Sequence, residues 1–183
     1  MVSPKILIVT HIPSPYQVEL FDAIAAQNVL DLSVIYLYTQ SSAPTARLWQ
    51  LSGLNHDHLI VNDDANAWAL AEKQIKAADL MIFNYYRHPW IPPSIERRNA
   101  EGKPWCFWGE RPGYRRLGLL GTWFRRWKLS VLHRSKVPIW GIGQWAVDQY
   151  RREFGRDRLY INFPYFSDLA RFGQYRGVEK KRT

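Results

Sequence analysis

Short apolar runs alternate with helical patterns along almost the whole chain, and this alternation limits the possible folds more than any other feature. The apolar runs cover residues 5–11, 31–38, 58–61, 79–84, 104–109, 137–141 and 159–163. Near-continuous apolar runs of this length are typical of parallel strands that are covered on both faces. The sequence therefore predicts an α/β domain, a Rossmann-like, doubly wound and mostly parallel sheet.

Helical patterns fill most of the intervals between these runs. Ser14 and Pro15 are typical of an N-cap followed by proline at the first helical position. The predicted helices cover residues 15–24, 66–78, 91–101, 117–133 and 144–154. Ligands of doubly wound sheets bind beyond the carboxyl ends of the strands. We therefore expect a site in the loops that begin at His11, Tyr85, Gly109 and Gly141.

Length and composition agree with one globular domain. The chain has 183 residues, which suits an α/β domain with a C-terminal extension. Its nine tryptophans and an aromatic share of 15% exclude disorder for most of the chain and favour broad binding surfaces. The single cysteine, Cys106, lies in an apolar run, which predicts a buried thiol in a reducing compartment. No window has the length and apolarity of a transmembrane span, so a cytoplasmic protein is expected, with peripheral attachment to the inner face of the membrane as an option.

The positive charge is concentrated in the middle of the chain. Residues 87–136 carry twelve basic and three acidic side chains. The net charge of this segment, +9, equals that of the whole protein. Residues 1–86 are net negative, with four basic and eight acidic side chains. A localised positive field favours an anionic partner such as lipid headgroups, nucleic acid or a phosphorylated small molecule. No groove-reading or RNA-stacking motif accompanies the charge, so nucleic acid is not expected as a partner.

Both ends of the chain resemble a known family. The opening segment contains Pro13-Ser14-Pro15-Tyr16-Gln17, followed by Leu20-Phe21. The closing segment has a strand, a small-residue turn, a helix, Gly155, a further strand and then Asp168-Leu169-Ala170-Arg171-Phe172. These motifs are similar to the first βα unit and to the end of the N-terminal domain in GT-B glycosyltransferases of family 4. The resemblance runs from about residue 5 to residue 172.

The resemblance implies a division of the chain and a reaction. Residues 1–163 would be the acceptor-side domain, the N-terminal half of a GT-B fold, and residues 164–183 an inter-domain crossover and tail. A nucleotide-sugar donor would bind mainly to a second domain, which carries a Glu-x7-Glu motif that is absent from this sequence. The parent enzyme would move a sugar, with retention and without a metal or other cofactor, to an acceptor hydroxyl on a glycan, a polysaccharide precursor or a lipid-linked acceptor. This chain alone is expected to be inactive.

Candidate site residues follow from the strand ends and from the resemblance. Many family members have a histidine after the strand that corresponds to residues 104–109, whereas this chain has Glu110. A glutamate there could bind sugar hydroxyls or act as the base for an acceptor hydroxyl, and it could equally form an ion pair with Arg111 or Arg87. The expected substrate-binding residues are His11, Ser14, Tyr16, Gln17, Tyr86, Arg87, Gly109, Arg111 and Gln144.

The predicted helix over residues 117–133 has two interpretations. Its apolar stripe includes Leu117, Leu120, Trp123 and Trp127, and arginines flank the stripe. Such a helix could pack on the sheet, or it could lie in a membrane interface with aromatic rings at headgroup depth. The candidate membrane contacts are Arg115, Arg116, Trp123, Arg126 and Trp127.

Two other functional classes remain open. Gly141-Ile142-Gly143-Gln144-Trp145-Ala146 matches the pattern G-x-G-x-x-G/A of dinucleotide-binding oxidoreductases, although it follows a late strand rather than the first. A non-enzymatic basic module that binds membranes or nucleic acid would also explain the charge. The five histidines show no metal-ligand spacing beyond His56-x-His58, so no metal site is predicted.

Overall fold

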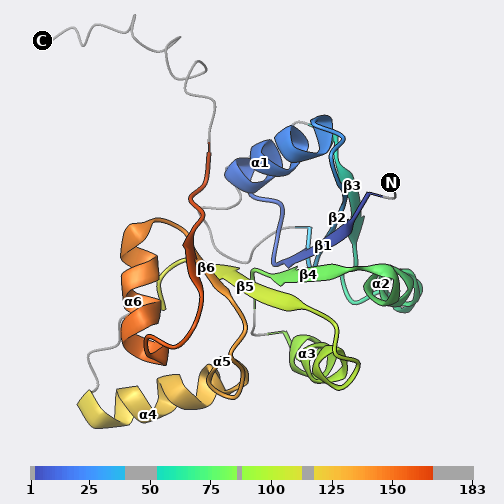
Figure 1. The fold of residues 1–183 in the computed structure, drawn as a ribbon. Helices are drawn as coiled ribbons and strands as arrows, with labels where there is room; N and C mark the ends of the chain where they lie inside the picture. Colours follow the sequence, from blue (N-terminus) through green and yellow to red (C-terminus); the bar gives the residue numbers. More distant parts are fainter. Residues whose placement is uncertain (1–2, 40–52, 86–87, 113–117, 167–183) are drawn as a thin grey trace, which may run out of the picture.

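The fold is built on one seven-stranded sheet in which every neighbouring pair of strands is parallel. The computed structural model describes residues 3–39, 53–85, 88–112 and 118–166 (Figure 1). The strands are β1 (Lys5–Thr10), β2 (Asp31–Tyr36), β3 (Asp57–Ile60), β4 (Leu80–Phe83), β5 (Trp105–Gly109), β6 (Ile139–Gly141) and β7 (Tyr160–Asn162). Their order across the sheet is β3-β2-β1-β4-β5-β6-β7. The predicted Rossmann-like α/β fold is confirmed.

Helices cover both faces of the sheet, but unequally. They are α1 (Pro15–Ala26), α2 (Ala65–Ala77), α3 (Ile91–Ala100), α4 (Gly118–Lys128), α5 (Ser130–His133) and α6 (Gln144–Phe154). One face is packed by α1, and Figure 1 shows α2, α3 and α5 on the opposite side of the sheet from it. Alternate residues of each strand therefore enter two separate cores, as the period of a strand requires.

The two cores differ in what covers the sheet. On the first face, Ala71, Ile95 and Leu132 bring α2, α3 and α5 onto the strands. On the second face, α1 contributes Leu20 and Phe21 to a cluster around Val34, Cys106 and Trp108. The segment after β7 also packs there, through Phe163 and Tyr165. Cys106 is only 2% exposed and burial raises the pKa of its thiol to about 12, so the predicted buried thiol is confirmed.

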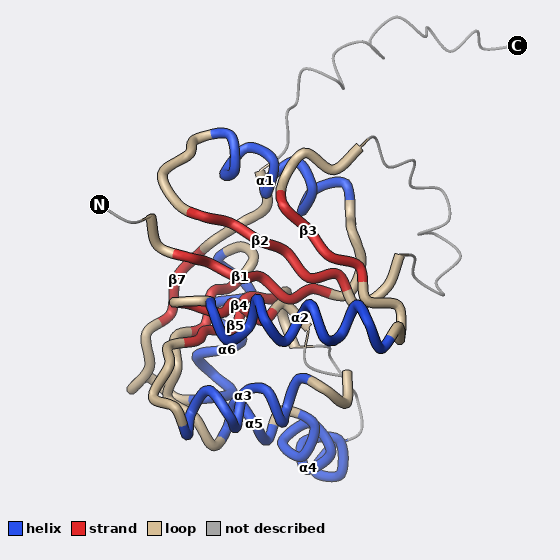
Figure 2. Tube along the Cα trace, turned by 90° about the vertical axis from the view of Figure 1, so that its right-hand side faces the viewer, coloured by secondary structure: helices blue, strands red, loops and turns tan. Residues whose placement is uncertain are grey.

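The single long helix expected over residues 117–133 is not observed. Its described part forms α4 and the short α5, which are separated at Leu129. Leu129 and Leu132 are only 3% and 2% exposed and join the first core, whereas α4 lies at the periphery of the molecule (Figure 2). One straight helix cannot place both its apolar stripe and these two leucines against the same strands. The break at Leu129 therefore turns α5 inward, and it leaves α4 outside the layer that covers the sheet.

One buried arginine joins α3 to three other elements beneath the first face. Arg98, in α3, is 1% exposed, and its guanidinium donates hydrogen bonds to four backbone oxygens. The acceptors are the carbonyls of Ile75, Ala78, Asp79 and Pro104, at distances of 2.8–3.3 Å. Two of these carbonyls belong to the last turn and the C-cap of α2, where backbone oxygens lack helical partners. Arg98 thus holds α3 against the end of α2 and the starts of β4 and β5.

We predict that Arg98→Ala lowers the free energy of unfolding by about 3 kcal/mol or more, because four buried carbonyls lose a charged donor. Urea denaturation followed by circular dichroism would measure the loss. Arg97→Ala is the matched control: Arg97 forms a 2.9 Å ion pair with Glu72 at the surface, and its loss should cost less than about 1 kcal/mol. Equal losses in the two variants would contradict the role assigned to Arg98.

Candidate functional site

A cavity of about 440 Å³ lies at the carboxyl ends of the central strands. It lies near the boundary between β1 and β4. These two strands are neighbours, but the chain continues from β1 to β2 in one direction across the sheet and from β4 to β5 in the other. This reversal of strand order is the usual ligand position of doubly wound sheets. The lining residues are His11, Asn84, Tyr85, Phe107, Gly109, Glu110, Arg111, Pro112, Leu129, Tyr150 and Tyr165. Polar and aromatic groups from distant parts of the sequence thus meet in one concave place.

Asn84 is the centre of a polar cluster at the base of this cavity. Its side-chain oxygen accepts hydrogen bonds from the Thr10 hydroxyl at 3.0 Å and from the Gln17 amide at 2.9 Å. Its amide nitrogen donates to the Trp108 carbonyl at 2.8 Å. Thr10 and Gln17 are almost fully buried, so these partners replace water for groups that would otherwise lose it. The cluster connects β1, α1, β4 and β5 at the point where the strand order reverses.

Tyr165 closes the cavity from the segment that follows β7. It lines the cavity together with Asn84 and Glu110, and its ring lies 5.5 Å from that of Trp108. Burial raises the pKa of Tyr165 to about 12, and the negative charge of Glu110 acts in the same direction. The hydroxyl therefore remains protonated throughout the physiological pH range. It is a stable hydrogen-bond donor beside the carboxylate.

Glu110 follows β5 directly and is exposed at the cavity. The Tyr150 hydroxyl of α6 donates a short hydrogen bond to the Glu110 backbone carbonyl, which fixes the main chain at this position. Within the described ranges, the Glu110 carboxylate forms no ion pair. The guanidinium of Arg111 instead lies 4.9 Å from the ring centroid of Trp145, a cation–π distance. The expected alternative of a Glu110–Arg111 ion pair is therefore not observed, and Arg87 lies outside the described residues.

His11 is held among aromatic rings at the end of β1. Its imidazole stacks on Tyr85 with ring centroids 4.5 Å apart, and it meets the edge of Tyr38 at 5.5 Å. The His11 backbone carbonyl accepts a hydrogen bond from the Tyr38 amide. The ring is thereby held in place in the wall of the cavity. This placement suits contact with a ligand, while the aromatic contacts also pack the loop.

A second hollow of about 290 Å³ adjoins the first. Glu110, Arg111 and Tyr165 line both, and the second also includes Trp145, of which 67% is exposed. Trp145 lies in the first turn of α6, so its indole face and the amino-terminal end of that helix are on the same rim. A flat aromatic surface beside a guanidinium offers stacking and charge to a ligand that extends from the main cavity.

The structure brings some of the expected substrate-binding residues together and separates others. His11, Gly109 and Arg111 line the cavity with Glu110. Gln17 lies beneath it in the Asn84 cluster, and Tyr16 reaches it indirectly, since its ring stacks on Tyr165 at 6.3 Å.

Two further expected residues lie outside the lining. Ser14 is the N-cap of α1 and makes no side-chain capping bond, while Gln144 is exposed on α6 and donates to Asp148 at 3.0 Å. Tyr86 lies outside the described residues, as Arg87 does.

Among the lining residues that the sequence reasoning missed are Asn84, Tyr150 and Tyr165. Asn84 had a usable signal, because it is the polar residue that ends the apolar run of β4. Tyr150 and Tyr165 had none, since an aromatic residue within a helix or after the last strand is equally typical of a core. Their place at the site depends on how α6 and the segment after β7 fold back onto β5.

Packing and backbone conformation explain why glycine occupies two positions of the G-x-G-x-x-A segment. A Cβ at Gly141 would lie 2.7 Å from the Val147 backbone nitrogen, so the residue must be glycine for α6 to approach β6. Gly143 has φ +87°, a conformation that favours glycine, and it precedes α6 as its N-cap. The segment follows β6, two strands away from the β1–β4 reversal. These observations explain the pattern without a bound dinucleotide.

The exposed surface of α4 carries a second candidate binding region. Leu120, Trp123 and Trp127 are 78%, 71% and 64% exposed, and their spacing places them along one side of the helix. Arg126 is also exposed, and Arg125 forms a 2.9 Å ion pair with Glu153 of α6. Arg115 and Arg116 lie outside the described residues. The apolar stripe of α4 therefore faces solvent rather than the sheet.

The described ranges contain no group of three or more His, Cys, Asp or Glu side chains that could hold a metal ion. The pair His56-x-His58 is used differently: His56 is buried and lies between Asp22, 2.5 Å away, and the Tyr36 hydroxyl, 2.9 Å away. This chain of contacts attaches α1 to β2 and to the start of β3. Among the helices that the structure describes, none is long and apolar enough to cross a membrane.

Comparisons with known proteins add no assignment. No known protein family matches the chain, and a search of characterised proteins found no significant match.

We predict that Asn84→Ala lowers the free energy of unfolding by about 1–3 kcal/mol, because buried groups of Thr10, Gln17 and Trp108 lose their shared partner. Thermal and urea denaturation would measure the change. The control is Gln144→Ala, which removes an exposed bond within one helix and should change stability by less than about 0.5 kcal/mol. If Asn84→Ala were as stable as the control, the cluster would not be a structural anchor of the site.

Proposed function

We propose that this chain is the acceptor-binding domain of a retaining glycosyltransferase. The observation that carries the proposal is the exposed Glu110 carboxylate at the end of β5, in a strand-end cavity walled by aromatic and hydrogen-bonding side chains. Binding sites for sugars need hydrogen-bonding groups at defined positions and apolar faces that pack on the ring. The nucleotide-sugar donor would bind mainly to a second domain, as the resemblance to family 4 implies.

In this proposal the cavity positions an acceptor hydroxyl for transfer. The acceptor oxygen forms a bond to the anomeric carbon of the donor sugar, and the bond from that carbon to the nucleotide diphosphate breaks with retention. Glu110 accepts a hydrogen bond from the acceptor hydroxyl and takes up its proton as the general base. Tyr165 donates a hydrogen bond, and His11 orients the sugar by ring contact. Closure of two domains over the site would exclude water.

Sugar binding by the 183-residue chain tests this proposal. Titration with a panel of methyl glycosides, followed by NMR of isotope-labelled protein, should shift the signals of His11, Glu110 and Tyr165. Glu110→Gln should weaken the affinity by about tenfold, since a charged hydrogen-bond acceptor is lost. Glu101→Gln is the matched control, because Glu101 pairs with Lys103 at the surface away from the cavity.

Two outcomes would contradict the proposal. One is the absence of any shift at the cavity with every glycoside. The other is tight binding of NAD(H) or NADP(H) that is lost in Gly143→Val, which would support the dinucleotide-binding alternative. A sugar-transfer assay of the chain alone should show little or no activity, because the donor site is assigned to another domain.

We also propose that α4 is a membrane-contact surface of this domain. Its support is the solvent-facing row of Leu120, Trp123 and Trp127 together with neighbouring arginines, a composition typical of helices that lie in the headgroup region. Exposed apolar patches on a protein surface mark sites of interaction with a membrane or another protein. Such attachment would bring the strand-end cavity to acceptors that reside in a membrane.

We predict that Trp123→Ser combined with Trp127→Ser lowers binding to phosphatidylglycerol-containing vesicles by about tenfold or more, because two interfacial aromatic rings are lost. Vesicle sedimentation at low and high salt would measure this. Leu70→Ser is the control, since Leu70 is 51% exposed on α2. Equal binding of all three proteins, or preference for an oligonucleotide over vesicles, would overturn the membrane assignment.

A further inference from the structure

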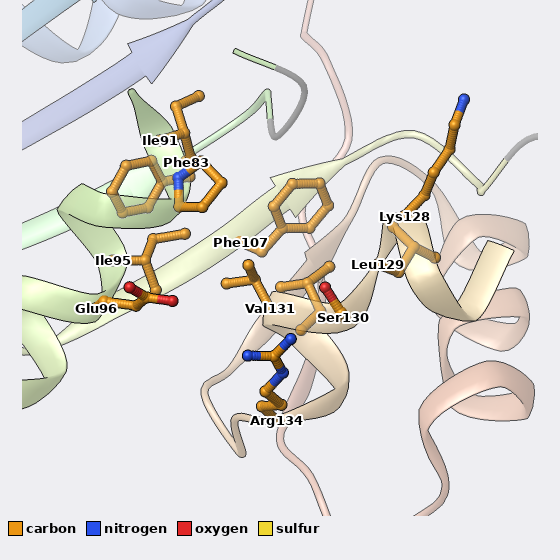
Figure 3. Close-up of a pocket in the computed structure, with 12 residues that line it drawn as sticks. Phe83, Ile91, Ile95, Glu96, Phe107, Lys128, Leu129, Ser130, Val131 and Arg134 are labelled. Carbon is orange, nitrogen blue, oxygen red and sulfur yellow. The ribbon is translucent and has the colours of Figure 1, made fainter. Parts of the chain in front are cut away.

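A third cavity lies between α3 and the α4–α5 junction and has an apolar floor. Its volume is about 170 Å³ (Figure 3). The floor is formed by the nearly buried side chains of Phe83, Ile91, Ile95, Phe107 and Leu129. A closed apolar cavity of about 150 Å³ is large enough to bind benzene. The space is therefore of the right size for a short stretch of hydrocarbon.

This cavity adjoins the strand-end cavity and shares two lining residues with it. Phe107 of β5 and Leu129 between α4 and α5 line both. The Phe107 ring stands between α3 and α5 (Figure 3). Gly109 ends the same strand, and Glu110 follows it. The two cavities are therefore neighbours, with Phe107 and Leu129 at their shared boundary.

The mouth of the cavity has the chemistry of a polar–apolar boundary. Glu96 of α3 and Arg134 after α5 lie on the rim, together with Lys128 at the end of α4. Lys128 extends away from the apolar floor in Figure 3, and its ammonium lies 4.7 Å from the ring centroid of Phe124. The rim has two cations and one carboxylate, so its net charge is positive and complements an anionic headgroup. Trp127, one of the two exposed tryptophans of α4, directly precedes Lys128 in the chain.

We propose that the cavity between α3 and α5 holds the hydrocarbon chain of an amphiphilic acceptor whose polar head lies in the strand-end cavity. This inference rests on the proposed function and names its acceptor class. The chain would enter beside α4, where the exposed apolar row meets a membrane, and the head would face Glu110. Burial of each methylene in the apolar floor adds affinity without any change in the contacts of the head.

Alkyl β-D-glucopyranosides of increasing chain length test the proposal on the 183-residue chain, below their micelle-forming concentrations. The affinity should rise by about fourfold for each added methylene until the cavity is full. Nuclear Overhauser effects should connect the alkyl chain to the methyl groups of Ile91, Ile95 and Val131. Affinity that does not depend on chain length, or effects confined to Leu120 and Trp123 on α4, would overturn the proposal.

A variant that fills the cavity gives a second measurement. Val131→Phe places a larger side chain at a partly exposed lining position, so folding should be tolerated. It should remove most of the gain of octyl over methyl glucoside and leave methyl glucoside binding unchanged. Val29→Phe is the control, at a 69% exposed position outside the cavity. An unchanged octyl gain in Val131→Phe would contradict the assignment.

The same titrations separate this inference from the proposed function. If n-octanol shows contacts with Ile95 and Val131 while no methyl glycoside shifts the strand-end cavity, the hydrocarbon site stands and the sugar site falls. If methyl glycosides bind at Glu110 and n-octanol makes no contact with the floor, the sugar site stands and the hydrocarbon site falls.

Discussion

The position of β1 between β2 and β4 is the constraint on which the rest of the structure depends. The chain builds the sheet outward from β1 to β3 and then returns through α2 to place β4 on the other side of β1. The loops after β1 and β4 consequently leave in different directions and open a space at the carboxyl edge. Asn84 fills the base of this space with hydrogen bonds to α1, β1 and β5. The placement of β1 between β2 and β4 thus determines both where the candidate site lies and which hydrogen bonds hold its base in place.

A second consequence concerns the periphery. The core beneath α3 and α6 needs Leu129 and Leu132, and the helix breaks so that these leucines can reach it. The break leaves α4 with an apolar row in solvent and creates a small apolar cavity against α3. The Arg125–Glu153 ion pair then holds α4 near α6. A packing requirement of the core therefore generates the two surfaces to which we assign membrane and hydrocarbon contact.

Much of the architecture was predictable, because each strand is a compact apolar run with clear boundaries. The run of β5 and the helix α3 follow from their local patterns alone, and so does the burial of Cys106. The long helix expected over residues 117–133 was wrong in its continuity. An apolar stripe in the sequence indicates that one side of a helix is apolar, but it does not indicate whether that side contacts a sheet, a membrane or solvent.

The sequence by itself determined the α/β class, the Glu110 position at the end of a buried strand, and the basic, aromatic character of the middle segment. These depend on residues near one another in the chain, whose patterns reflect the period of a strand or helix. Only the tertiary structure decided that Asn84 bonds to Gln17 across 67 residues, that Tyr165 returns to the site and that α4 faces solvent. Such contacts depend on the packing of whole elements against one another, and no local pattern contains that information.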